Sequence, residues 1–229
     1  MSIRILAIET TVEEGSIAAA IGERLVAESP LDRNARSAQS LAPAIKLLLD
    51  SIAWEPRSID LVAIDVGPGS FTGTRIGVTT AKAFAYAVEA QCLAIESLEV
   101  VAAQAPSGAA HISVAINAQR RQVFTTDFTR DSNARPVAAG GIEILDNETW
   151  LKGLAPEVTA TGLALEKLRE HLPHNVVIAP QPSWTPRAET IAQLAAKHYA
   201  AGRRDDLWKL KPRYLRRSAA EETWLKRNG

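Results

Sequence analysis

The sequence predicts an α/β protein of two lobes, each built on a mixed β-sheet flanked by helices. Short apolar runs alternate with segments of helical periodicity along the 229 residues. Three strands in succession open the chain, and a Pro/Gly-containing break at residues 105–108 interrupts the pattern near its middle. We therefore expect an N-terminal lobe at residues 1–105 and a C-terminal lobe at residues 106–229. The final segment, about residues 203–229, is expected to pack back on the N-terminal lobe.

The N-terminal lobe is expected to have the element order βββαβαβα. Gly22-Glu23 is typical of a hairpin turn between its second and third strands. Pro43 favours a start of the first helix near Ser40, because proline is tolerated only in the first helical turn. Ser97 is a candidate cap for the third helix. The expected strands cover residues 3–9, 16–21, 25–28, 61–66 and 91–95, and the expected helices cover residues 41–52, 72–89 and 98–104.

The C-terminal lobe begins with two strands joined by a polar turn at residues 117–122. A loop at residues 131–141 follows, and Asp146 is a candidate helix cap. Tyr214-Leu215 is expected to form a short strand that returns to the rest of the sheet. The other strands are expected at residues 111–116, 123–129, 142–145, 158–161 and 176–178, and the helices at residues 147–151, 163–171 and 188–201.

The glycine-rich stretch at residues 67–77 lies between a buried strand and a helix, and the chain is organised around it. Such a turn can direct backbone N–H groups and the positive end of a helix at an anion. The candidate phosphate-binding residues are Thr10, Gly67, Gly69, Ser70 and Thr72.

Four small residues recur every fourth position along the helix that follows: Gly73, Gly77, Ala81 and Ala85. This stripe of nearly bare backbone permits close approach of another helix. That helix can belong to a second chain, or it can be a neighbour within the same chain, and the sequence leaves both alternatives open.

Composition and motifs exclude several classes of protein. No apolar run is long enough to cross a membrane, and the single Cys92 indicates a reducing, cytoplasmic setting. The four histidines have no zinc-ligand spacing, so no metal site is expected. The glycine stretch has neither a nucleophile-elbow pattern nor a Walker lysine. Residues 203–229 hold nine Lys/Arg against four Asp/Glu, which is compatible with nucleic-acid contact or with a solvated surface.

Three blocks of the sequence resemble the bacterial TsaB (YeaZ) family. They are residues 5–11 (ILAIETT), residues 67–77 (GPGSFTGTRIG) and residues 212–216 (PRYLR), and their order spans almost the whole chain. The resemblance implies an actin/Hsp70/sugar-kinase (ASKHA) type of fold. It also implies a non-catalytic role in forming threonylcarbamoyladenosine (t6A) at adenosine 37 of tRNAs.

The resemblance also implies partners. These are the catalytic subunit TsaD and the ATPase TsaE, with a homodimer when the chain is alone, tRNA bound only through the complex, and no membrane. No cofactor is expected on the isolated chain, while ATP or ADP can lie at the interface of the complex. The first two helices are expected to form the partner contact, which gives as interface residues Leu41, Ile45, Leu48, Gly73, Arg75, Gly77, Ala81 and Ala85.

Two positions depart from the family pattern. Ser37 stands where many relatives have histidine, and Asn117 stands where many have an aspartate that begins the central turn. The second change disfavours an independent nucleotide site. The alternative hypothesis, a small-molecule ATPase or kinase of the same fold, rests on Glu9, Thr10 and the glycine turn.

Overall fold

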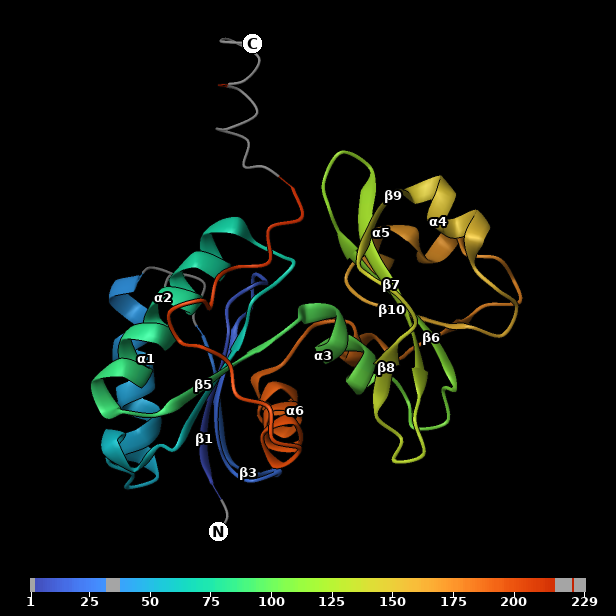
Figure 1. Cartoon of the computed structure of the whole chain (residues 1–229). Coiled ribbons are helices and arrows are strands. Elements are labelled where there is room, and N and C mark those ends of the chain that lie inside the picture. The colour runs from blue at the N-terminus through green and yellow to red at the C-terminus, as the bar shows by residue number, and fades with distance from the viewer. Residues whose placement is uncertain (1–2, 32–37, 217–223, 225–229) are drawn as a thin grey trace.

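Two β-sheets lie side by side in the computed structural model, which describes residues 3–31, 38–216 and 224 (Figure 1). The first sheet has the strand order β3-β2-β1-β4-β5. The pairs β1–β2 and β2–β3 are antiparallel, whereas the pairs β1–β4 and β4–β5 are parallel. The strands are β1 (Arg4–Glu9), β2 (Ser16–Ile21), β3 (Arg24–Pro30), β4 (Leu61–Asp65) and β5 (Gln91–Ile95).

Helices cover both faces of this sheet. Leu6 and Ile8 of β1 pack in one core cluster with α1 (Ala38–Ser51) and α2 (Phe71–Val88), whereas Ile5 and Ala7 pack in a second cluster with α6 (Ala188–Ala200). This alternation follows from the two-residue period of a strand. Because both faces are covered, β1 and β4 are buried along nearly their whole length.

The second sheet repeats the arrangement of the first. Its order is β11-β10-β6-β7-β8, and β9 also pairs with β7. The antiparallel pair β6–β7 followed by parallel β10 and β11 corresponds to β1–β2 followed by β4 and β5. The predicted ASKHA-type fold of two lobes with mixed sheets is therefore confirmed. The elements are β6 (His111–Asn117), β7 (Gln122–Arg130), β8 (Pro136–Ala138), β9 (Glu143–Asp146), α4 (Asn147–Gly153), β10 (Thr159–Thr161), α5 (Leu165–Leu168) and β11 (Val177–Ile178).

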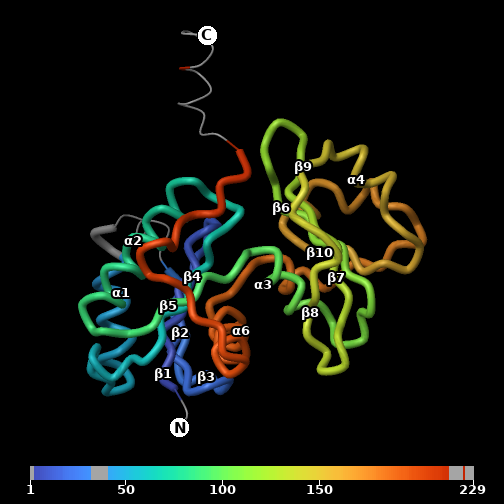
Figure 2. Tube along the Cα trace, viewed as in Figure 1, coloured from blue at the N-terminus to red at the C-terminus, as the bar shows by residue number. Residues whose placement is uncertain are grey.

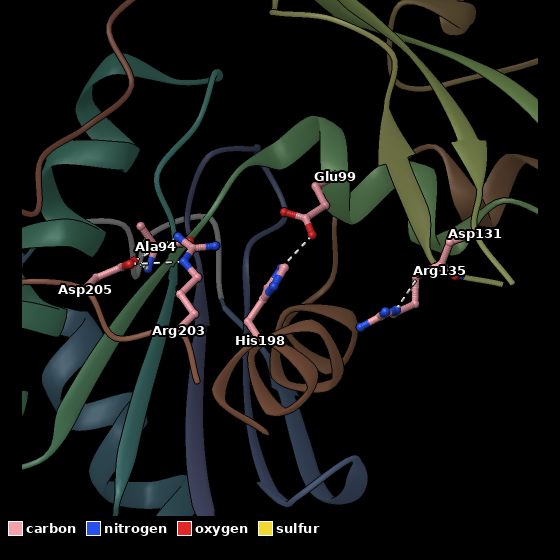
Figure 3. A network of polar contacts seen from close by, with 7 residues as sticks. All are labelled: Ala94, Glu99, Asp131, Arg135, His198, Arg203 and Asp205. Carbon is pink, nitrogen blue, oxygen red and sulfur yellow. Dashed lines mark hydrogen bonds and ion pairs between the residues drawn. The ribbon is translucent and has the colours of Figure 1, made fainter. Parts of the chain in front are cut away.

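Helix α3 (Ser97–Gln104) lies between the sheets (Figure 2). Its Leu98 and Val101 pack against the second sheet, while Val100 packs in the cluster of α6 and the first sheet. A hydrogen bond links α3 to α6, since Nε2 of His198 lies 2.7 Å from Oε1 of Glu99 (Figure 3). The two lobes are thus joined by packed side chains as well as by the chain itself.

The return of the chain to the first sheet begins earlier than predicted. The sequence places it near residue 203, but α6 already packs on the first sheet, because its apolar stripe fits the face that Ile5 and Ala7 present. Beyond α6, the side chains of Arg203 and Asp205 hydrogen-bond to the backbone carbonyl and N–H of Ala94 in β5, and they also bond to each other (Figure 3). The strand predicted at Tyr214-Leu215 is wrong, because these residues pair with no sheet.

Other differences from the predictions are local. The loop at residues 131–141 contains β8, which the sequence analysis missed, and α1 begins two residues before Ser40. Ser97 is the first residue of α3 rather than its cap, and Asp146 precedes α4 without a side-chain capping bond. Ser37 and the tail at residues 217–223 and 225–229 lie outside the described residues. No helix in the described ranges is both long and apolar enough to cross a membrane.

Candidate functional site

The glycine-rich turn packs closely against the end of β1. The backbone N–H of Ser70 donates a 2.7 Å hydrogen bond to the carbonyl of Thr11, and the hydroxyl of Thr10 donates a 2.8 Å bond to the carbonyl of Gly73. Ser70 also caps α2, because its side-chain oxygen accepts the N–H of Gly73. Strand end, turn and helix start therefore form one hydrogen-bonded unit.

The glycines of this region are needed for contact within the chain. A Cβ atom on Gly73 would lie 1.9 Å from the carbonyl oxygen of Thr10, and one on Gly77 would lie 2.1 Å from its hydroxyl oxygen. A Cβ on Gly69 would lie 2.6 Å from the carbonyl oxygen of Thr11. Only glycine lets α2 approach the end of β1 so closely.

The small residues of α2 were expected to let another helix approach closely, and this packing shows what they approach instead. The four small residues of the stripe are all buried, and they face the chain's own sheet. The alternative left open by the sequence, packing within the same chain, is the right one, although the neighbour is a sheet and not a helix. The stripe residues are Gly73, Gly77, Ala81 and Ala85.

Most of the other predicted interface residues also point inward. Leu41, Ile45 and Leu48 are at most 5% exposed, because the apolar stripe of α1 packs on the sheet. Arg75 is exposed, and its Nε donates a 2.7 Å hydrogen bond to the hydroxyl of Tyr214.

The outer face of the two helices consists of residues that the sequence analysis did not select. Leu47 is the largest apolar side chain on this face of α1, and it is 69% exposed. The signal for it was present in the sequence, since Leu47 lies outside the periodic set that predicts the buried stripe. We call this the α1–α2 outer face; its exposed residues are Ala42, Pro43, Lys46, Leu47 and Asp50 of α1 and Thr72, Thr79, Ala83 and Ala87 of α2.

Two carboxyl groups are buried beneath the turn, at the ends of adjacent strands β1 and β4. Oε1 of Glu9 accepts hydrogen bonds from the N–H and the hydroxyl of Thr11, at 2.5 and 2.6 Å. Oδ1 of Asp65 accepts the hydroxyl of Ser97 at 2.6 Å and the N–H of Gly67 at 2.8 Å. Oε2 of Glu9 is buried and has no hydrogen-bond partner among the described residues.

Burial changes the protonation of both acids. Burial, and to a smaller extent the nearby Asp65 carboxylate, raise the pKa of Glu9 to about 8. The hydrogen bonds from Thr11 act in the opposite direction. Burial likewise raises the pKa of Asp65 to about 7, although the hydrogen bonds from Ser97 and Gly67 act in the opposite direction. Two buried carboxylates side by side repel each other, so the pair holds a proton near neutral pH.

The predicted phosphate-binding residues lie at this turn, and three of them have a donor group engaged within the chain. The N–H of Gly67 is bonded to Asp65 and that of Ser70 to Thr11, and the hydroxyl of Thr10 is bonded to Gly73. Gly69 contacts Thr11, and only Thr72 and Ser70 are exposed. The backbone N–H groups of Gly67 and Ser70 and the hydroxyl of Thr10 are therefore committed to contacts within the chain.

Glu9 and Asp65 are not joined by a third potential metal ligand among the described residues. Within residues 3–31, 38–216 and 224, no group of three or more His, Cys, Asp or Glu side chains is placed to hold a metal ion. Cys92 is buried, and burial raises the pKa of its thiol to about 12. Its place in the first core cluster fits a packing role.

The turn between β6 and β7, where Asn117 departs from the family pattern, contacts Arg216 of the C-terminal segment. Gln119, Arg120 and Arg121 all have positive φ angles, of 61°, 52° and 58°. A guanidinium nitrogen of Arg216 donates a 2.7 Å bond to the carbonyl of Ala118 in this turn. The described end of the chain thus bridges from the first lobe to the second.

Comparisons with known proteins agree on one family. The family model "TsaD: tRNA N6-adenosine threonylcarbamoyltransferase" matches residues 29–224. The chain is 28% identical to the tRNA threonylcarbamoyladenosine biosynthesis protein TsaB of Bacillus subtilis, over 96% of this chain and 97% of that protein. It is 26% identical to TsaB of Escherichia coli, over 99% of both chains.

Solved structures give the same result. YeaZ from Pseudomonas aeruginosa superimposes with a TM-score of 0.79 at 26% sequence identity, covering 93% of this chain and 100% of that one. The family model covers most of the sequence, and the full-length relatives carry the TsaB name. The chain therefore belongs to the TsaD family, among its TsaB (YeaZ) members.

Proposed function

We propose that this chain is a non-catalytic scaffold subunit in the threonylcarbamoylation of tRNA adenosine 37. It pairs with a TsaD-like catalytic subunit and works with a TsaE-like ATPase. The family assignment supports the pathway, since the TsaB relatives are named for threonylcarbamoyladenosine biosynthesis. The observation that supports a docking role is the exposed apolar surface of α1 and α2, on which Leu47 is the most prominent apolar side chain at 69% exposed.

The α1–α2 outer face has the character of a protein interface. It combines Leu47 with Ala42, Pro43, Ala83 and Ala87, whose short side chains let a partner approach the helices closely. The inner faces of both helices are firmly packed on the first sheet, so the outer face is presented by a rigid support. Exposed apolar side chains on such a support favour binding of another folded surface.

Replacing Leu47 with aspartate is expected to weaken binding of the TsaD-like partner about tenfold or more, because a buried charge would then lack a counterion. The free energy of unfolding should change by less than about 0.5 kcal/mol, because the side chain is exposed in the isolated chain. Isothermal titration calorimetry and urea denaturation measure the two quantities.

Ile178→Asp provides the matched control, since Ile178 is also an exposed apolar residue, 44% accessible, but lies on β11 in the second lobe. It should leave partner binding unchanged. Equal losses for both variants, or unchanged binding for Leu47→Asp, would place the partner contact elsewhere.

The same outer face is proposed to pair two copies of the chain when the partner is absent. Light scattering should then show a dimer that Leu47→Asp converts to a monomer. We further place the protein in the cytoplasm, with tRNA reached through the complex, and place any ATP or ADP at the interface between subunits.

The alternative, an ATPase or kinase acting alone, draws on the buried acids Glu9 and Asp65. It is disfavoured because two backbone donors of the glycine turn, the N–H groups of Ser70 and Gly67, are already bonded to Thr11 and Asp65. Titration of the isolated chain with ATP and magnesium distinguishes the two. Tight binding with turnover would replace the scaffold proposal.

A further inference from the structure

The end of the described chain lies along α2 and forms a surface of aromatic and basic side chains. After α6, residues 203–216 cross the first lobe and run past α2 toward the turn of the second lobe (Figures 1 and 2). We call this surface the aromatic–basic strip; its residues are Phe71, Arg75, Lys82 and Tyr86 of α2 and Trp208, Lys209, Lys211, Arg213 and Tyr214 of the C-terminal segment.

The strip is held in place at both ends. At the N-terminal end of α2, the ring of Tyr214 stacks on Phe71 with centroids 4.6 Å apart, and the guanidinium of Arg75 lies 5.1 and 5.5 Å from the two ring centroids. At the other end, Tyr86 meets Trp208 edge to face at 5.6 Å.

Between these ends, polar and apolar contacts fix the backbone. The ammonium group of Lys82 donates to the carbonyls of Trp208 and Leu210, at 3.2 and 3.1 Å. The side chain of Leu210 is buried in the first core cluster. The C-terminal segment is therefore a fixed part of the surface.

The aromatic side chains of the strip remain accessible. Trp208 is 71% exposed, Tyr86 66% and Tyr214 45%. A single exposed aromatic side chain is ordinary on a protein surface. Here three exposed aromatic rings lie on one surface, and such a group is typical of an interaction site. Flat rings on a fixed support are suited to stacking with other planar groups.

The charge of the strip is predominantly positive. Arg75, Lys82, Lys209, Lys211 and Arg213 accompany the aromatic rings. Among the described residues, the acids that form ion pairs with them are Asp206, 3.6 Å from Lys209, and Glu96, 3.2 Å from Arg213. The side chain of Lys209 is 86% exposed. Arg216 continues the positive charge to the turn of the second lobe, beside the exposed Arg121.

We propose that the aromatic–basic strip is an RNA-binding surface that contacts the tRNA in the assembled complex. This inference rests on the proposed function, and it adds a direct contact between this subunit and the substrate. Trp208 and Tyr86 stack on unpaired bases or riboses, and Lys209 and Lys211 contact phosphates. Aromatic rings interleaved with cations are typical of surfaces that bind single-stranded nucleic acid.

A protein partner fits this strip less well than RNA. Tryptophan, tyrosine and arginine are common in both kinds of interface, but lysine is depleted at protein–protein interfaces. Lys209 and Lys211 flank the buried anchor Leu210, and both are exposed. The strip adjoins the α1–α2 outer face without coinciding with it, since Ala83 and Ala87 lie about 100° further around α2 than Arg75, Lys82 and Tyr86.

The test uses the full chain in complex with its TsaD-like partner and an unmodified tRNA transcript that reads a codon beginning with A. Trp208→Ala is expected to weaken tRNA binding about tenfold, while Trp208→Phe, which retains a ring, should restore most of the affinity. The double variant Lys209→Gln/Lys211→Gln should lower the slope of log Kd against log salt by about 1.5, as expected for two lost phosphate contacts. Fluorescence anisotropy at several salt concentrations measures both effects.

The matched control is Lys152→Gln/Lys167→Gln, which removes the same charge from exposed positions of the second lobe. It should change neither the affinity nor the salt slope. Unchanged tRNA binding in the strip variants, or equal losses in the control, would overturn the inference.

Gel filtration of each variant with the partner separates this inference from the proposed function. If the wild-type chain forms no complex, the proposed function fails. If the complex forms with all variants and only tRNA binding falls, the RNA-binding surface is supported. If the strip variants instead lose the partner, the strip is a protein-docking surface and the inference is wrong.

Discussion

Replacing Gly73 with alanine is expected to lower the free energy of unfolding by about 3 kcal/mol or more. The added methyl group would lie 1.9 Å from the carbonyl oxygen of Thr10, and that oxygen belongs to backbone that cannot rotate away. Relief requires moving the start of α2 away from β1, which would break the hydrogen bonds of Thr10 to Gly73 and of Ser70 to Thr11. Urea denaturation followed by circular dichroism measures the change.

The direction of this effect is opposite to that expected from helix propensity. Alanine in place of glycine inside an exposed helix normally stabilises a protein by about 1 kcal/mol. Thr79→Ala, on the outer face of the same helix, is the control and should change stability by less than about 0.5 kcal/mol. If Gly73→Ala folded with wild-type stability but no longer bound its partner, the small-residue stripe would be a docking surface after all.

The fold was largely predictable because its signals are local and repeated. The bounds of β2 and β5 agree with the sequence analysis, since each is a short apolar run between turn residues. The destination of α6 was not predictable in the same way. Its amphipathic stripe shows that it must pack on something, but nothing in the stripe specifies the first sheet rather than the second.

The stripe on α2 illustrates why the candidate site was harder to predict than the fold. Small residues at intervals of four show that something approaches the backbone closely, but a strand end and a second helix satisfy the pattern equally well. The contact that decides the matter is formed by Thr10, which lies more than sixty residues away in the sequence. The buried positions Leu41 and Ile45 were assigned to an interface through the resemblance, although their periodicity alone predicts a core.

The carboxyl pair could be suspected from the sequence but not characterised. Glu9 and Asp65 each end an apolar strand, and such acids are often exposed. Their burial depends on the turn of residues 67–73 closing over the strand ends, and on Ser97, which was predicted to cap a helix but instead donates its hydroxyl to Asp65. The pair therefore ties together β1, β4 and the start of α3, and its protonation should influence the stability of the whole lobe.

Replacing Glu9 with glutamine is expected to flatten the pH dependence of stability. The pKa of Glu9 is raised from 4.5 to about 8 in the folded state, so the folded protein holds this proton more tightly than the unfolded chain does. Stability of the wild type should therefore fall as the pH rises from about 4.5 to about 8, and level off above that. Glutamine is neutral throughout this range and has nearly the same shape, so the fall should be smaller in the variant.

The difference between the two proteins should grow with pH in favour of Glu9→Gln, by roughly 5 kcal/mol between about pH 4.5 and pH 8, since each unit of the pKa shift corresponds to about 1.4 kcal/mol. Urea denaturation between pH 5 and pH 9 provides the comparison. Glu166→Gln, an exposed position in the second lobe, removes the same charge and should leave the profile unchanged. A parallel pH profile for Glu9→Gln and wild type would mean that Glu9 is ionised in the folded protein. The carboxylate would then need a counterion that fills the unpartnered position at Oε2, and the turn would be a cation site instead of a protonated pair.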